Sequence, residues 1–235
     1  MSDRRGYGRR TADDAGPSAR RLFVGVPLPA DVAAEISQVV EGVRAQPLPA
    51  GARDVRWVRL DGLHLTLRFL GPTSPDRLAP TMDAVGIAAQ AADGPIEIEL
   101  SGAGTFPAGR RPRTLWIGIS GGSEGLAALA ERTEAALVDA GWETEGRPFR
   151  PHLTLARSDG VSVGPLVADR LASAMRGRRI GCVIDTLGLF ESITGGGPAR
   201  YLPIVLHGLG SSADPAGPVY HQTAPESSGG SPGPT

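Results

Sequence analysis

The sequence contains no lysine and no asparagine, so all 24 of its basic side chains are arginines. They are balanced by 25 acidic side chains, and the formal net charge is −1. This balance excludes the overall basic field that is typical of proteins binding nucleic acid through charge alone. Any recognition of phosphate must therefore be local, and the forked guanidinium of arginine suits phosphate oxygens.

Cysteine is nearly absent as well, because Cys182 is the only one. A single cysteine excludes an internal disulfide and a multi-cysteine metal cluster. No apolar run approaches the length needed to span a membrane, and Met1–Arg20 lacks the apolar stretch of a secretory signal. We therefore expect a cytoplasmic protein with no membrane partner.

Composition favours a folded centre with polar ends. The hydrophobic fraction of 40% is sufficient for a core of one domain or two small lobes. Residues 1–20 are charged and rich in arginine, and residues 210–235 are rich in Ser, Pro and Gly. These compositions predict two disordered tails around a folded region at residues 21–209.

The most informative motif is His-Leu-Thr-Leu, which occurs at His64–Leu67 and again at His152–Leu155. It uses two of the four histidines in the chain. In an extended strand, residues two apart point to the same face. Each copy therefore predicts a strand with an apolar back and a front that carries one imidazole and one hydroxyl.

The repeat extends beyond these four residues. Leu22–Val26 and Leu115–Ile119 share the order Leu, aromatic, β-branched, Gly, β-branched. Apolar periodicity and turn residues predict the following elements. The expected strands are Leu22–Val26, Val55–Leu60, His64–Leu70, Ile96–Leu100, Leu115–Ile119, His152–Leu155, Val183–Leu189 and Tyr201–Leu206, and the expected helices are Ala30–Arg44, Ser74–Ala92, Ser123–Ala140 and Gly164–Arg176, with Ser123 as N-cap and Gly141 as a stop.

Each half thus follows the order β-α-β-α-β. Such alternation is also compatible with a parallel α/β sheet. The short link Asp61-Gly62-Leu63, however, indicates a hairpin between Val55–Leu60 and His64–Leu70. We therefore predict an α+β fold of two duplicated lobes, in which each lobe is a small antiparallel sheet with outer helices. Pseudo-twofold symmetry would place the two His-Thr faces opposite one another across an active-site cleft.

With these motifs, the chain resembles the two-histidine (2H) phosphoesterases. Within them it is similar to the bacterial RNA 2′,3′-cyclic phosphodiesterases, also called 2′-5′ RNA ligases (LigT/ThpR-like). The resemblance rests on the segments His64–Gly71 and Pro151–Arg157, and it extends to Arg21–Val26, Trp57-Val58 and Pro112–Trp116. It covers essentially all of residues 21–206, and it implies the same two-lobed fold.

Two imidazoles on opposite sides of a phosphorus atom can act as general acid and general base near neutral pH. Threonine hydroxyls can donate hydrogen bonds to the oxygens on which negative charge develops. Two histidines without nearby carboxylates make a poor metal site, and this chemistry needs neither metal nor cofactor. The residues do not distinguish acid from base, because the two His-Thr contexts are nearly the same.

The resemblance supplies the roles. It implies that His64 is the proton donor to the leaving 3′ oxygen and that His152 is the proton acceptor that activates water. Thr66 and Thr154 complete the catalytic set. The implied partner is an RNA with a 2′,3′-cyclic phosphate terminus, which would become a 2′-phosphate. The same groups, used in reverse, would join RNA ends through a 2′-5′ linkage.

Two arginines are candidates for binding the phosphate. Arg68 shares strand parity with His64 and Thr66, which would place it beside the phosphate. Arg157 has the opposite parity to His152, so it reaches the cleft only if the strand ends or bulges there.

Aromatic and further basic residues form a second group of candidates. Three aromatics are candidates for stacking on a terminal base, although ordinary core packing also explains them: Phe106, Phe149 and Trp57. A basic cluster on a loop either steers RNA or is a solvated surface run: Arg110, Arg111 and Arg113. The remaining histidines, His207 and His221, have no paired motif and are expected to be non-catalytic.

Three functions remain open from the sequence alone. The first is the RNA cyclic phosphodiesterase. The second is a related enzyme for another substrate, such as ADP-ribose 1″,2″-cyclic phosphate or 2′-5′ oligoadenylate. The third is an idle RNA-end-binding module, although the retention of both histidines and both threonines argues against it. A monomer is expected, because one chain would complete the cleft.

Overall fold

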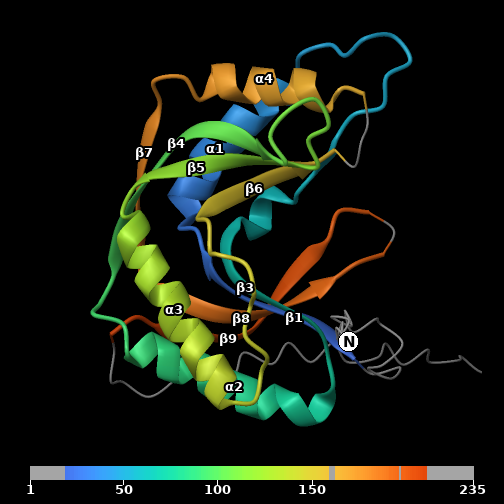
Figure 1. Ribbon diagram of the computed structural model, residues 1–235. Helices are drawn as coiled ribbons and strands as arrows, with labels where there is room; N and C mark the ends of the chain where they lie inside the picture. Colours follow the sequence, from blue (N-terminus) through green and yellow to red (C-terminus); the bar gives the residue numbers. More distant parts are fainter. Residues whose placement is uncertain (1–18, 159–161, 196, 211–235) are drawn as a thin grey trace, which may run out of the picture.

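The computed structural model describes residues 19–158, 162–195 and 197–210 (Figure 1). Nearly all of both predicted tails, together with His221, lies outside the described residues. In chain order the elements are β1 (Arg20–Pro27), α1 (Ala30–Arg44), β2 (Arg56–Trp57), η2 (Leu60–Gly62), β3 (His64–Thr73), η3 (Pro75–Arg77), α2 (Leu78–Gln90), β4 (Ile96–Phe106), β5 (Thr114–Gly121), α3 (Ser123–Asp139), β6 (His152–Arg157), α4 (Gly164–Ala174), β7 (Arg179–Ile184), β8 (Thr186–Ile193) and β9 (Arg200–Gly208).

The strands form two separate sheets. One has the order β3-β1-β8-β9 and the other β2-β6-β5-β4-β7. Neighbouring strands are antiparallel throughout both sheets. The predicted α+β fold with two antiparallel lobes is thus confirmed, and each lobe carries one His-Leu-Thr-Leu strand, β3 or β6.

The two halves of the chain exchange elements between these lobes. The first lobe, built on the four-stranded sheet, takes β8 and β9 from the end of the chain and is covered by α2, with α3 packed on α2 and β3. The second lobe, built on the five-stranded sheet, takes β4 and carries α1 and α4 (Figure 1). Each lobe therefore contains residues from both copies of the duplication.

One predicted strand pairing was wrong. Val55–Leu60 does not form a hairpin with β3. Its central residues become β2, which pairs with β6, while Leu60–Gly62 forms a 3-10 helix. Trp57 explains why β2 pairs with β6 and not with β3. Its ring is buried in the core, and its indole N–H donates to Asp54 at 3.0 Å. A local turn signal was outweighed by the burial of one large side chain.

The apolar run Val183–Leu189 was predicted as one strand but is divided at Asp185. β7 lies at the edge of the five-stranded sheet, whereas β8 is a central strand of the other sheet. The backbone carbonyl of Asp185 accepts the Leu209 N–H at 2.8 Å, which fixes the crossing between the lobes. A continuous apolar run does not reveal such a crossing, because both parts are buried.

Helix ends differ slightly from the prediction. The N-cap of α3 is Gly122 rather than Ser123, with φ of 72°. A Cβ at Gly122 would lie 2.0 Å from the Glu97 carbonyl oxygen, so only glycine fits this close approach. The predicted stop at Gly141 agrees with the structure, where α3 ends at Asp139 and Gly141 has φ of 84°.

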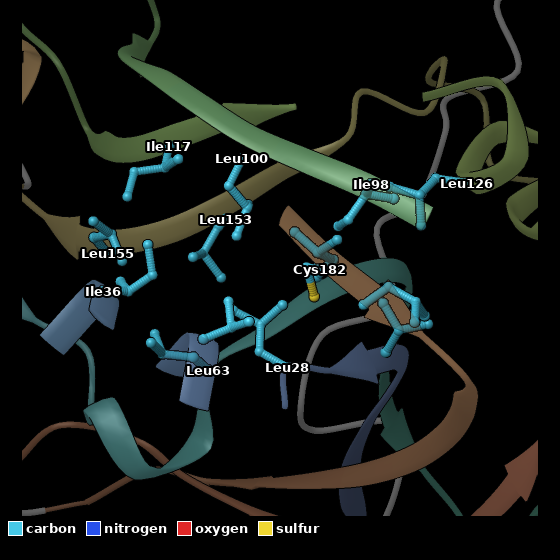
Figure 2. Packing of buried hydrophobic residues seen from close by; sticks show 14 of the residues in the cluster. Leu28, Ile36, Leu63, Ile98, Leu100, Ile117, Leu126, Leu153, Leu155 and Cys182 are labelled. Atoms are coloured by element: carbon cyan, nitrogen blue, oxygen red, sulfur yellow. The ribbon is translucent and has the colours of Figure 1, made fainter. Parts of the chain in front are cut away.

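A single cluster of buried apolar side chains runs through both lobes. Figure 2 shows Ile36 of α1 facing Leu155 and Ile117 of the second lobe, with Leu28 and Leu63 beside them. Leu28 and Leu63 follow and precede strands of the first lobe, so this core joins the two lobes. It fixes their relative position and hence the relative position of β3 and β6.

Candidate active site

Each His-Thr pair lies on the side of its sheet that is not packed against the core. Leu65 and Leu153 are completely buried, whereas His64 and His152 are only partly buried. β3 and β6 are in contact across the junction of the lobes. The local alternation predicted from the motif is therefore present in both strands.

Both strands contain a β-bulge at the same position. Thr66 is opposite Gly25 and Arg68 is opposite Val24, so Leu67 has no partner on β1. In the same way, Thr154 is opposite Trp116 and Ala156 is opposite Leu115, which leaves Leu155 without a partner on β5. A bulge shifts the alternation by one residue. The fifth residue after each histidine, rather than the fourth, therefore shares the histidine's face.

Phe69 and Arg157 occupy these shifted positions. Phe69 pairs with Phe23, and the two rings lie 6.1 Å apart, on the side where Phe23 also stacks on His64. Phe69 is 56% exposed, so its ring borders the open side of the site. Arg157 pairs with Thr114, on the same side of β5 as Trp116 and Gly118, the partners of Thr154 and His152. The bulge required for Arg157 to reach the cleft is therefore present.

Arg68 takes the opposite face, contrary to the sequence prediction. Its side chain is 11% exposed and forms ion pairs with Glu134 of α3 at 3.4 Å and Glu145 at 3.2 Å. It also donates a hydrogen bond to the carbonyl oxygen of Glu143. The bulge at Leu67 causes the difference, because it turns Arg68 toward α3 and away from His64.

The loop from α3 to β6 is held to the first lobe by further contacts. The Arg77 guanidinium lies 4.0 Å over the ring of Trp142 and donates to the Gly141 carbonyl at 2.8 Å. The indole N–H of Trp142 donates to the Thr81 hydroxyl at 3.1 Å. This loop leads directly to β6, so these contacts couple the position of His152 to the lobe that carries His64.

His64 lies among three aromatic rings. Its imidazole stacks on Phe23 with centroids 4.6 Å apart, meets the ring of Tyr201 edge-on at 4.6 Å, and lies 6.2 Å from Phe190. Burial in this apolar environment lowers the pKa of His64, and the hydrogen bond to Gly62 offsets only part of that effect.

His152 has a related but more open environment. The ring of Phe106 meets it edge-on at 5.0 Å, and Trp116 lies 6.3 Å away. Burial lowers the pKa of His152 and the positive charge of Arg157 lowers it further, against the opposing effect of the hydrogen bond to Arg150. Arg157 also opposes the rise that burial causes in the pKa of Tyr201. The guanidinium is thus within electrostatic reach of His152 and of Tyr201, the neighbour of His64.

The two imidazoles are oriented in the same way. Nδ1 of His64 lies 2.8 Å from the Gly62 carbonyl, and Nδ1 of His152 lies 2.7 Å from the Arg150 carbonyl. A carbonyl oxygen only accepts, so Nδ1 carries the proton in both residues. Nε2 is therefore the nitrogen that exchanges protons, accepting when the ring is neutral and donating when it is charged.

Thr66 and Thr154 each lie two residues after their histidine and on its face. Both are partly buried, and within the part of the chain that the structure describes neither hydroxyl has a hydrogen-bond partner. Both hydroxyls are therefore free to donate a hydrogen bond.

Of the other residues predicted for the site, some lie beside the histidines and others lie elsewhere in the structure. Phe106 contacts His152, whereas Phe149 packs against the hydrophobic core and Trp57 is buried in it. The cluster Arg110, Arg111 and Arg113 is exposed on the connection that follows Phe106. His207 packs below α2, with its ring close to Gly86, and is not part of this site.

Sequence reasoning missed the rings that support the histidines. Phe23 and Trp116 are the aromatic residues of the repeated Leu-aromatic-β-branched-Gly-β-branched pattern, and they contact His64 and His152 respectively. Their equivalent positions in the repeat could have indicated that each contacts the histidine of its own half. Tyr201 gave no such signal, because it reaches His64 only through the exchange that brings β9 into the first lobe.

A family model described as the 2'-5' RNA ligase superfamily matches residues 28–195. The chain belongs to the 2'-5' RNA ligase superfamily. This membership confirms the resemblance to two-histidine phosphoesterases drawn from the motifs.

Curated relatives of the superfamily carry a common name, RNA 2',3'-cyclic phosphodiesterase. The protein of Geobacillus stearothermophilus is 33% identical over 135 residues, which are 57% of this chain and 41% of the relative. The protein of Aeropyrum pernix is 33% identical over 140 residues, 59% of this chain and 77% of the relative. For Escherichia coli the values are 33% over 148 residues, 62% and 77%.

Solved structures are similar to this protein over most of its length. Escherichia coli LigT complexed with 3'-AMP has a TM-score of 0.62 at 26% identity, covering 83% of this chain and 100% of LigT. A Thermus thermophilus protein has the same TM-score and identity, covering 82% and 100%. These likenesses agree with the two-lobed fold.

The described residues contain neither a group of side chains suited to a metal ion nor a helix that could span a membrane. Within residues 19–158, 162–195 and 197–210, no three His, Cys, Asp or Glu side chains are grouped so that they could hold a metal ion. None of the helices in this described part is long and apolar enough to cross a membrane.

Proposed function

We propose that this protein hydrolyses RNA 2′,3′-cyclic phosphate ends to 2′-phosphate ends without a metal ion. The observation that carries the proposal is the matched pair of imidazoles. His64 and His152 come from equivalent strands of the two lobes, and each has Nδ1 bound to a backbone carbonyl, so that Nε2 is free for proton transfer. The common name of the curated relatives supports the choice of substrate.

The proposed reaction is an in-line displacement at phosphorus. A water oxygen attacks phosphorus while its proton passes to Nε2 of neutral His152. The bond from phosphorus to the ribose 3′ oxygen breaks, and Nε2 of protonated His64 gives its proton to that oxygen. His152 then returns its proton to solvent and His64 takes one up, which restores the starting state.

Three side chains are proposed to stabilise the transition state. The hydroxyls of Thr66 and Thr154 donate to the non-bridging oxygens, where negative charge accumulates. Arg157 supplies a positive charge on the His152 side. An RNA 5′-hydroxyl in place of the attacking water would give 2′-5′ ligation through the same groups, and we propose this as a side reaction of a monomeric enzyme.

The test is an assay in chelator with a short RNA that ends in a 2′,3′-cyclic phosphate, followed by identification of the product. We expect a 2′-phosphate from the wild type, and no product from His64→Ala or His152→Ala. His207→Ala is the matched control, because that histidine packs below α2, and it should retain turnover. Hydrolysis of a small cyclic phosphate or a 2′-5′ oligonucleotide, without turnover of the RNA, would contradict the proposed substrate.

A further inference from the structure

A cavity of about 550 Å³ lies directly beside His64. It is bounded by the first turns of α1, by η2 and by strands β8 and β9, and Leu28 and Leu63 also line it. Its volume falls within the range of sites that bind small organic molecules. His64 and Tyr201 belong both to the cavity and to the candidate active site, so the two are continuous.

The walls of the cavity are mainly apolar. From α1 come the small side chains Ala30, Ala33 and Ala34, and from β8 and β9 come Phe190, Pro203 and Leu206. Leu206 is 37% exposed, which leaves a large apolar side chain uncovered on this wall. An aromatic ring system gains most from such surfaces, because it buries apolar area and can contact the partly exposed ring of Tyr201.

Several polar groups at the edge of the cavity already have a partner, whereas the Tyr201 hydroxyl has none among the described residues. The Ser37 hydroxyl donates to the Ala33 carbonyl at 2.7 Å, and Asp61 is paired with Arg59 at 2.6 Å. The Gly62 carbonyl accepts from His64. The cavity therefore distinguishes ligands by size and apolar surface more than by their hydrogen-bonding edges.

The position of the cavity beside His64 indicates which part of the substrate it binds. His64 lines the cavity and His152 does not. In an in-line reaction, the proton donor lies beside the leaving 3′ oxygen, and the ribose that carries this oxygen lies on the same side of phosphorus. We propose that the cavity binds the nucleobase of the 3′-terminal nucleotide, the one that carries the cyclic phosphate. This inference rests on the proposed function, and in particular on His64 as the donor.

The experiment compares three short RNAs that differ only in the nucleoside bearing the 2′,3′-cyclic phosphate: adenosine, uridine, or a ribose without a base. For the wild type, we expect KM to rise by roughly 5- to 150-fold when the adenine is removed, the range typical of one stacked base. Uridine should lie between them, because its smaller ring buries less area. Equal KM values for all three RNAs would overturn the proposal, and this comparison requires no variant.

Ala34→Leu then locates the effect, since leucine would fill part of the cavity. We expect it to raise KM for the adenosine end and to leave KM for the base-free end close to the wild-type value. Gln38→Leu is the matched control, because Gln38 is exposed one turn further along α1 and does not line the cavity. It should keep the wild-type difference between the two ends.

The outcomes separate this inference from the proposed function. If Ala34→Leu raises KM equally for both ends, the base does not occupy the cavity, although the hydrolysis stands. If Phe106→Ala removes the preference for a base while Ala34→Leu keeps it, the base lies on the His152 side and the proposal is overturned. If none of the three RNAs is hydrolysed, the proposed function itself fails, and this inference fails with it.

Discussion

Arg68 and Arg157 offer a direct test of how the bulges shape the site. Both follow a His-Leu-Thr-Leu motif, and both are candidates for binding phosphate by sequence. The structure places Arg68 on the helix side of β3, in ion pairs with Glu134 and Glu145, and Arg157 on the histidine side of β6. Replacement by methionine, which keeps the apolar stem and removes the charge, should therefore affect stability in one case and activity in the other.

For Arg68→Met we expect a loss of stability of about 2 kcal/mol. Removing one partner of a fully buried ion pair costs about 3–5 kcal/mol, whereas an exposed pair contributes about 0–1 kcal/mol. The side chains of Glu134 and Glu145 are 25% and 30% exposed, so the cost lies between these limits. For a chain of this size the melting temperature would fall by about 4–8 °C.

For Arg157→Met we expect little change in stability, because Arg157 is exposed and has no ion pair within the described residues. A hydrogen bond to a charged group contributes about 1.5–3 kcal/mol. Its loss from the transition state would lower kcat/KM by about 10- to 150-fold. Arg157→Lys should recover part of the loss, because lysine restores the charge but not the forked geometry.

The measurements are urea unfolding and steady-state kinetics on the cyclic-phosphate RNA, at a temperature where all variants are folded. Arg68→Met should stay within a few-fold of the wild-type kcat/KM. The face assignment would be refuted if Arg68→Met lost more kcat/KM than Arg157→Met, or if Arg157→Met were the less stable of the two.

Three further predictions concern protonation and backbone geometry. Burial lowers the pKa of both His64 and His152, so kcat/KM should follow a bell-shaped pH profile with its maximum on the acid side of about 6.5; a bound phosphate anion would raise the pKa of His64, and the falling limb for kcat should lie at higher pH. Gly122→Ala should destabilise the fold by about 2 kcal/mol or more, given the positive φ and the close approach to Glu97, whereas Gly42→Ala in α1, with nothing near the added methyl, should stabilise it by about 0.5–1 kcal/mol; urea titrations measure both. Burial raises the pKa of the Cys182 thiol to about 11, so iodoacetamide at pH 8 should alkylate it only after unfolding, and rapid labelling of the native protein would contradict its buried position.

Sequence reasoning succeeded where the signal is local. The two-residue alternation placed His64 with Thr66 and His152 with Thr154, and the turn glycine Gly141 ended its helix as predicted. It failed at Arg68. A bulge is one unpaired residue in the hydrogen-bond ladder between two strands, and no particular residue type in the sequence marks its position. For Arg157, the sequence indicated only that the residue would reach the cleft if the strand ended or bulged there.

The exchange of strands between the lobes could not be predicted from the sequence either. The pattern of the two halves predicted that each would form its own lobe. The identity of a strand's neighbour depends on contacts between residues far apart in the chain, such as Phe23 with Phe190 at 5.2 Å and Phe23 with Tyr201 at 5.4 Å. No periodicity within either segment records these pairings. For the same reason Tyr201 could not be assigned to the site beforehand.

The exchange has a consequence for the order in which the protein matures during synthesis. The five-stranded sheet has all its strands once β7 has left the ribosome, whereas the four-stranded sheet must wait for β8 and β9, which follow β7 in the chain. The lobe that contains β1 is therefore the last of the two to close. Until then one edge of β1 has no partner strand, and exposed edges of this kind invite pairing with other chains. The nascent chain thus depends on β8 and β9 both to bring Tyr201 to His64 and to cover the open edge of β1.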